Sequence, residues 1–218
     1  MKNNKLFLSS LIINLLTFLL VVTGTIVMFT IGSGALQNKG FTVFKFFTFQ
    51  SNLFMGAIAF IYAYYQFLII KGKQDKIPHL LMVFNHVAVT AVALTFTIVV
   101  AFLAPGYGFL LMYTKANLFF HAIVPLLAMA NYMFLEKECQ ISFKETLPSL
   151  IPSVLYGTVY FIIVVSLKAY GDPDIDFYMF GANGPLVGAF NFLAVVSIAY
   201  ALGLLLYFVN LIVFKKRR

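Results

Sequence analysis

The stretch LFLSSLIINLLTFLLVVTGTIVMFTI, residues 6–31, contains no charged residue and decides the fold class. A helix needs roughly 20 apolar residues to cross the hydrocarbon core of a bilayer. Within that core the backbone must satisfy its own hydrogen bonds, so a spanning segment is predicted to be helical. The apolar run is too long for a signal peptide and lacks a convincing small-residue cleavage site, so we expect it to remain as the first spanning helix.

The rest of the chain repeats this pattern. Of its 218 residues, 62% are hydrophobic and 10% are charged, whereas about a quarter of the residues of a soluble domain are charged. Five further uncharged stretches cover residues 46–70, 77–114, 116–135, 146–167 and 177–214. The sequence therefore predicts an all-α, polytopic integral membrane protein in which residues 1–218 form a single transmembrane domain. Its six helices are predicted at residues 6–31, 44–70, 79–103, 116–135, 148–168 and 188–214.

The basic residues are distributed unequally between the two sets of loops. The side that carries both termini has Lys2, Lys5, Lys71, Lys73, Lys76, Lys137, Lys144, Lys215, Lys216, Arg217 and Arg218. The other side has only Lys39, Lys45, Lys115 and Lys168. The positive-inside rule then predicts that both termini are cytoplasmic, in agreement with an even number of helices. Because this orientation explains the net charge of +8, we expect no nucleic-acid partner.

Three polar residues at the start of the second predicted helix, Thr48, Ser51 and Asn52, have the spacing i, i+3, i+4 and share one face. Inside a membrane such residues often join helices or bond to the carbonyl one turn back. A polar cluster with a suitable partner is also typical of a functional site. Both interpretations stay open at this point.

A histidine in the fourth predicted helix is that partner. His121 and Asn117 are spaced i, i+4, and the second and fourth helices run in the same direction. At 1.5 Å per residue, Thr48 and His121 both lie roughly 6–8 Å below the outer helix ends, so they can meet. Pro125 removes the usual helical partner of the His121 carbonyl. It predicts either a kink that makes room for a ligand or an ordinary transmembrane proline.

A threonine and a histidine at the same depth indicate nucleophilic chemistry. A neutral imidazole can take the proton of a threonine hydroxyl that attacks an acyl carbonyl, and can return it to the leaving alcohol. Thr48 and His121 are therefore the predicted catalytic residues. Asn52, Ser51 and Asn117 are the candidates for contacting the substrate or the developing oxyanion. No acid that would orient His121 is evident in the sequence.

The other ionisable groups indicate no further site. His86 lies nearer the cytoplasmic end, and we expect it to be structural. Residues 171–176, GDPDID, resemble the start of a calcium loop, but Phe177 and Asn183 stand where glycine and glutamate are required. We therefore expect a solvated acidic loop, no metal site and no cofactor. Cys139, the only cysteine, allows no intramolecular disulfide.

Two segments carry a resemblance to a known family. Residues 46–53, FFTFQSNL, and 121–127, HAIVPLL, together with the six-helix layout of nearly the whole chain, resemble the androgen-induced and androgen-dependent membrane proteins and their bacterial six-helix relatives. The animal members are intramembrane threonine hydrolases that cleave fatty acid esters of hydroxy fatty acids. The resemblance implies that Thr48 is the nucleophile, that His121 is the catalytic histidine, and that the chain resides in a bacterial cytoplasmic membrane.

The resulting hypothesis is an intramembrane enzyme that hydrolyses a fatty acyl lipid ester taken from the bilayer. One alternative is a small-molecule transporter or channel, and another is a non-catalytic membrane scaffold or sensor. Away from the helix ends, no acidic or basic residue other than histidine lies within a predicted span, which weighs against an ion pump or a proton-coupled transporter. The sequence does not indicate an oligomeric state.

Overall fold

The computed structural model describes residues 2–33, 38–136 and 141–215, with side chains from residue 5 onward. Cys139, Lys137 and the last three residues lie outside the described part. Six helical segments are long and apolar enough to cross a membrane: Lys5–Thr30, Phe47–Ile70, His79–Tyr107, Ala116–Phe134, Phe143–Ser166 and Pro185–Lys215. The described part contains no strand, only an antiparallel bridge between Ser33 and Lys115. The prediction of an all-α chain with six helices of spanning length is confirmed.

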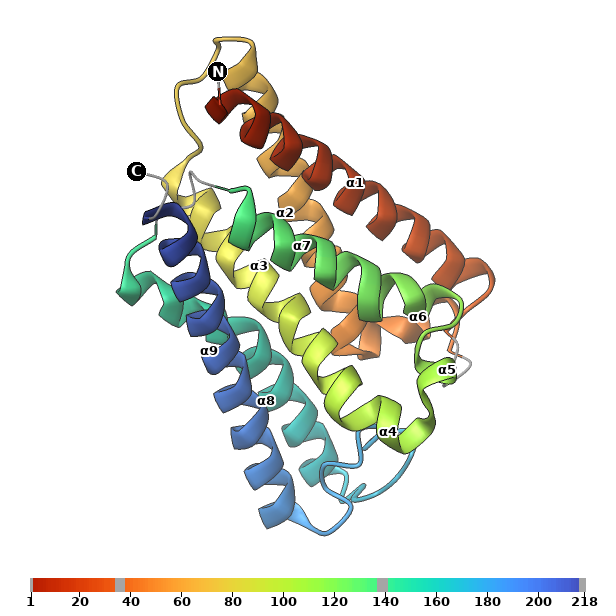
Figure 1. Ribbon diagram of the computed structural model, residues 1–218. Coiled ribbons are helices and arrows are strands. Elements are labelled where there is room, and N and C mark those ends of the chain that lie inside the picture. Colours follow the sequence, from red (N-terminus) through yellow and green to blue (C-terminus); the bar gives the residue numbers. More distant parts are fainter. Residues whose placement is uncertain (1, 34–37, 137–140, 216–218) are drawn as a thin grey trace.

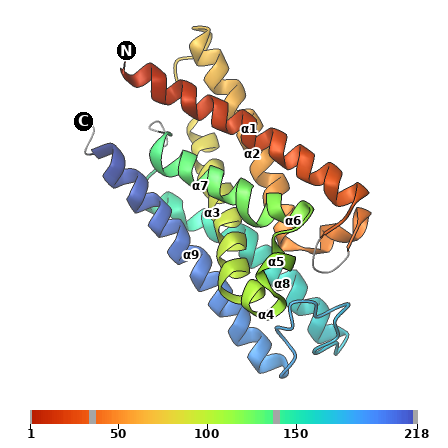
Figure 2. The ribbon, with the colours of Figure 1, turned by 45° about the vertical axis from the view of Figure 1, so that its right-hand side comes forward.

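Figure 1 shows the six segments as one elongated bundle. The long helices are α1 (Lys2–Thr30), α2 (Phe47–Ile70), α3 (His79–Ile98), α7 (Val124–Phe134), α8 (Ile151–Ser166) and α9 (Pro185–Lys215). The short elements are η1 (Gly40–Lys45), η2 (Val99–Leu103), α4 (Ala104–Tyr107), α5 (Phe109–Met112), α6 (Ala116–Leu118), η3 (Phe119–Ile123) and η4 (Phe143–Leu150). The start of α1 and the end of α9 lie at the same end of the bundle, here called the terminal end (Figures 1 and 2).

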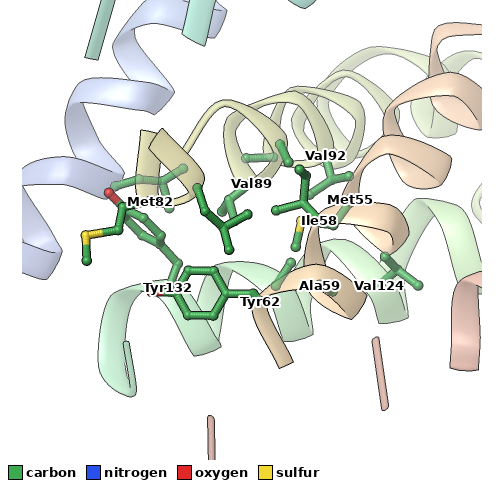
Figure 3. Close-up of a cluster of buried hydrophobic side chains, with 14 of the residues drawn as sticks. Met55, Ile58, Ala59, Tyr62, Met82, Val89, Val92, Val124 and Tyr132 are labelled. Atoms are coloured by element: carbon green, nitrogen blue, oxygen red, sulfur yellow. The ribbon is translucent and has the colours of Figure 1, made fainter. Parts of the chain in front are cut away.

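The core lies where α2, α3 and α7 meet. Figure 3 shows Tyr62 of α2, Val89 of α3 and Tyr132 of α7 in one cluster, and all three side chains are buried. On its other side α2 packs against α1 at Gly56, where an added Cβ would lie 2.7 Å from Val21 Cγ1. Small residues permit such close helix contacts in membranes, where packing rather than water exclusion joins helices.

Four predicted helix starts differ from the structure, since α1 begins before residue 6 and α9 begins at Pro185 rather than at residue 188. The other two differences have an identifiable local cause. The second helix begins at Phe47 rather than at residue 44, because Phe46 adopts an extended conformation (φ −94°, ψ 133°) between η1 and α2. The fifth span begins at Phe143 rather than at residue 148, because Ser142 and Glu145 form a capping box that supports a 3₁₀ turn. Thr48 is therefore the second residue of α2 and not the fifth.

A buried network of polar side chains lies toward the terminal end of the bundle. Oε1 of Glu136 accepts hydrogen bonds from Asn131 (2.8 Å) and Asn14 (3.2 Å), and Oε2 accepts one from Asn85 (2.5 Å). Asn14 also donates to Gln66 (3.1 Å). Glu136 is only 1% exposed, although it follows the apolar stretch of the fourth span in the sequence. The amide donors of three helices, α1, α3 and α7, replace water around the carboxylate, which makes its burial tolerable. We call these five residues the terminal-end network.

Candidate functional site

Thr48 lies where the chain enters α2, at the end of the bundle opposite to the terminal end. The first N–H groups of a helix have no intrahelical acceptor, and here the Phe47 N–H instead donates to the hydroxyl of Tyr178 (3.2 Å). The Thr48 side chain is half-buried and lines two cavities of about 70 Å³ each. Within the described residues its hydroxyl has no hydrogen-bond partner. It is therefore available to a molecule in either cavity.

The first of these cavities brings Thr48 and His121 together, and we call it the histidine cavity. Asn117 and His121 line it from the start of the fourth span, and Thr48 lines it from α2. No hydrogen bond joins Thr48 to His121 among the described side chains. A water molecule needs about 10–15 Å³ of such space, so the cavity has room for a reactive group that touches both residues.

A backbone carbonyl orients His121. Its Nδ1 lies 2.7 Å from the carbonyl oxygen of Met112, and the side chain is 7% exposed. A carbonyl oxygen only accepts hydrogen bonds, so Nδ1 carries the proton and the neutral ring keeps its lone pair on Nε2. This contact fills the role for which the sequence offered no acid. No sequence signal could have found it, because any residue at position 112 has the same carbonyl.

The helix is distorted where it carries His121. Phe119–Ile123 form a π-turn in which the Val124 N–H bonds to the Phe119 carbonyl. The next bond of that pattern would join residue 125 to the Phe120 carbonyl, but Pro125 has no N–H. Asn52 supplies the missing donor, since its Nδ2 lies 3.1 Å from the Phe120 carbonyl oxygen. The predicted disturbance at Pro125 thus takes the form of a π-turn that is tied to α2.

These contacts distinguish the three oxyanion candidates. Asn52 is fully buried, and its Nδ2 donates to the carbonyls of Phe120 and Thr48, so both of its N–H bonds are occupied. Ser51 is also buried and shares a hydrogen bond with Thr95 of α3 (3.0 Å). Asn117 is 4% exposed and lines the histidine cavity, and its side chain has no partner among the described residues. Of the three, Asn117 has a donor to offer.

The second cavity beside Thr48 is apolar, and we call it the apolar cavity. α3, α8, α9 and the loop before α9 enclose it. Gly157 of α8 and Phe192 of α9 both line this cavity. An added Cβ at Gly157 would lie 2.4 Å from the ring of Phe192, so only glycine allows the two helices to pack this closely here. Thr48 and Tyr178 line both cavities. Thr48 therefore lies between two mainly apolar cavities, of which only the histidine cavity contains His121 and Asn117.

The loop of residues 167–184 covers this end of the bundle, and Asp176 shapes it. Asp176 is fully buried and accepts hydrogen bonds from the Tyr160 hydroxyl (2.6 Å) and from the N–H groups of Gly171 and Gly181 (both 2.9 Å). The prediction of a solvated acidic loop is wrong for this residue, because the three donors replace its water. The described residues contain no group of three or more His, Cys, Asp or Glu that could hold a metal ion.

Tyr178 extends from this loop toward the start of α2. Burial raises the pKa of Tyr178 to about 12, so its phenol stays protonated at neutral pH. His86 lies in the core and lines neither of the two cavities beside Thr48. It is fully buried, and its Nδ1 is 2.9 Å from the Tyr132 hydroxyl.

Comparisons of the chain with models of protein families, with curated proteins and with solved structures find no match.

Proposed function

We propose that this chain is an intramembrane hydrolase that cleaves an ester of a fatty acyl lipid through a threonine nucleophile. One observation carries the proposal: Thr48, His121 and Asn117 line one cavity, in which the Met112 carbonyl holds His121 in the tautomer that a general base requires. A fatty acid ester of a hydroxy fatty acid is the substrate type that the resemblance favours.

The reaction proceeds in two stages. Thr48 Oγ1 attacks the ester carbonyl carbon while its proton moves to Nε2 of His121. When the tetrahedral intermediate collapses, the C–O bond to the alcohol breaks and the alcohol oxygen takes that proton. Water then attacks the acyl-threonine and gives a proton to His121, and the released Oγ1 is reprotonated. In sum, one water is added to the ester and a fatty acid and an alcohol are released.

Asn117 supplies the oxyanion donor in this proposal. A preorganised amide stabilises the charge that develops on the carbonyl oxygen, and it is most effective where water is excluded. The Met112 carbonyl orients His121 as the acid of a serine triad does. Being neutral, it stabilises an imidazolium less than a carboxylate would.

The membrane arrangement follows from the distribution of basic residues. We propose a bacterial cytoplasmic membrane with both termini in the cytoplasm, which the shared position of the described chain ends at the terminal end supports. Thr48 then lies near the outer interface. There, water for deacylation is available, and a lipid can approach from the bilayer.

The test is labelling of the purified protein with a fluorophosphonate, beside Thr48→Ala and His121→Ala variants whose melting behaviour shows that they are folded. The proposal predicts labelling of the wild type and none of either variant, followed by turnover of lipid esters. Labelling that persists in Thr48→Ala excludes Thr48 as the nucleophile.

A second candidate function, transport of a small molecule, is favoured by the terminal-end network. A carboxylate buried among helices of spanning length, as Glu136 is, is typical of proteins that move ions or protons. Glu136 lies just after the fourth span, so its burial weakens the argument against transport that the sequence offered. Substrate flux in proteoliposomes that survives Thr48→Ala and disappears in Glu136→Gln would favour this function over hydrolysis.

A further inference from the structure

A large groove of about 910 Å³ runs between α2, α3 and α8. Its apolar wall is formed by Phe54 of α2, Val83 and Val87 of α3, and Leu155 and Val159 of α8. Lys45 and Gln50 lie at one end of the groove. We call it the lipid groove. It is far larger than the two cavities beside Thr48, and it opens on the side of the bundle.

We propose that the lipid groove binds one long hydrocarbon chain of an anionic bilayer lipid, with the charged end of that lipid beside Lys45. If the chain is the ester hydrolase proposed above, this groove is also the route by which the substrate reaches Thr48. Only that second part rests on the proposed function.

The position and shape of the groove select the occupant. A groove on the side of a membrane-spanning bundle is filled from the bilayer, whose molecules are mainly hydrocarbon chains. Within a bilayer, burial of apolar surface provides little driving force, so occupancy depends on close packing. A chain in the groove contacts three helices, whereas a chain on the exposed face of α9 contacts one, and dispersion contacts add up over many atoms.

The polar end of the groove selects the charge of the occupant. The Lys45 ammonium lies 5.0 Å from the ring centre of Phe177 and 5.3 Å from that of Phe46. Its Nζ is 3.4 Å from the Asp174 carbonyl oxygen. Asp174 also lines the groove, but no ion pair joins its carboxylate to Lys45 among the described residues. The Lys45 ammonium therefore remains a positive charge beside an apolar groove, an arrangement that complements an anionic amphiphile.

The groove and the apolar cavity beside Thr48 share one wall. Phe47, Tyr156 and Tyr160 line both the groove and the apolar cavity beside Thr48. The rings of Phe47 and Tyr156 lie 5.2 Å apart, and the Tyr156 hydroxyl donates to the Lys45 carbonyl (2.5 Å). These aromatic side chains therefore separate a hydrocarbon chain in the groove from the apolar cavity beside Thr48.

The test uses the full-length protein in nanodiscs with a fatty acid that carries a photoreactive diazirine in the middle of its chain. Cross-linked positions are mapped by mass spectrometry. We expect several-fold more cross-links to α3 and α8 at the groove than to α9. Leu155→Trp, which fills the groove, should abolish this excess. The matched control is Leu193→Trp, since Leu155 and Leu193 are 63% and 61% exposed and Leu193 is not among the groove-lining residues.

Two further variants separate the parts of the proposal. Lys45→Gln should reduce labelling by the anionic probe and leave labelling by its neutral methyl ester unchanged. Thr48→Ala should label at the groove as the wild type does. A wild-type protein that labels at the groove but hydrolyses no lipid ester refutes the hydrolase and leaves the lipid groove standing. Even labelling around the bundle, or an excess that survives Leu155→Trp, overturns the lipid groove whether or not the protein is a hydrolase.

Discussion

The terminal-end network and the surroundings of Thr48 are both polar, yet they use their polar groups differently. In the network the amide nitrogens of Asn14, Asn85 and Asn131 all bond to Glu136. Around Thr48, the hydroxyl of Thr48 and the amide of Asn117 have no partner among the described residues and line a cavity. Polar groups that satisfy one another hold helices together, whereas polar groups that face a cavity are free to bind a substrate. Substitutions should therefore affect stability at one end and activity at the other.

The largest effect is expected from Thr48→Val, which keeps the shape of the side chain and removes its hydroxyl. The loss of a nucleophile should lower kcat on the order of 10³-fold or more. The melting temperature should stay close to that of the wild type, because the hydroxyl has no protein partner. Hydrolysis of a fluorogenic acyl ester and thermal unfolding in detergent measure the two quantities. A variant that melts earlier and remains active would identify Thr48 as a helix contact.

Glu136→Ala should lower the stability of the protein and leave its activity unchanged, which is the opposite of what is expected for Thr48→Val. It removes the acceptor of one N–H bond on each of three buried amides. Each unsatisfied N–H costs about 1–3 kcal/mol, so we expect at least ~3 kcal/mol less stability. Activity per folded molecule should not change. Asp75→Ala is the control, since Asp75 is exposed and its removal should leave stability almost unchanged. Unaltered melting of Glu136→Ala would mean that the network does not hold these helices together.

A smaller effect is expected from Asn117→Ala, which removes the proposed oxyanion donor. The loss in kcat should be about 10²-fold, with little change in KM. Asn52→Ala is the informative comparison, because it removes the hydrogen bonds to the carbonyls of Phe120 and Thr48. That variant should lose roughly 1–2 kcal/mol of stability. If Asn52→Ala keeps its stability and Asn117→Ala its activity, the two roles have been assigned the wrong way round.

The smallest effect is expected from Tyr178→Phe. It removes the acceptor of the Phe47 N–H, which should lower stability by about 1 kcal/mol and kcat only a few-fold. Tyr64→Phe serves as the control, since Tyr64 is 54% exposed. A loss of activity as large as that of Thr48→Val would give the Tyr178 hydroxyl a direct role in proton transfer.

The sequence predicted some contacts of the site and missed others, for identifiable reasons. The helical spacing and similar depth of Thr48 and His121 predicted that they could meet, and both line one cavity. The Met112 contact to His121 could not be predicted, because it uses a backbone carbonyl that every residue has. The burial of Asp176 was also missed, since its partners include two backbone N–H groups of a loop.

Glu136 illustrates the same limit on a larger scale. In the sequence Glu136 directly follows the uncharged stretch 116–135, so it is expected to be an exposed charged residue at the end of a helix. In the structure the donors around it come from α1, α3 and α7, and they are distant from one another in the chain. Hydrophobic periodicity contains no information on such partners, because each helix contributes a single amide.

The sequence by itself determined the class of the protein and the helices of spanning length. The reason is that solvation by lipid acts on every residue of a segment, so that the absence of charge over some twenty positions is a sufficient signal. Only the tertiary structure decided which polar groups are satisfied and which face a cavity. Hydrogen bonds depend on atomic positions within a few tenths of an ångström. Helix packing sets these positions, and the sequence does not show how one helix is placed against another.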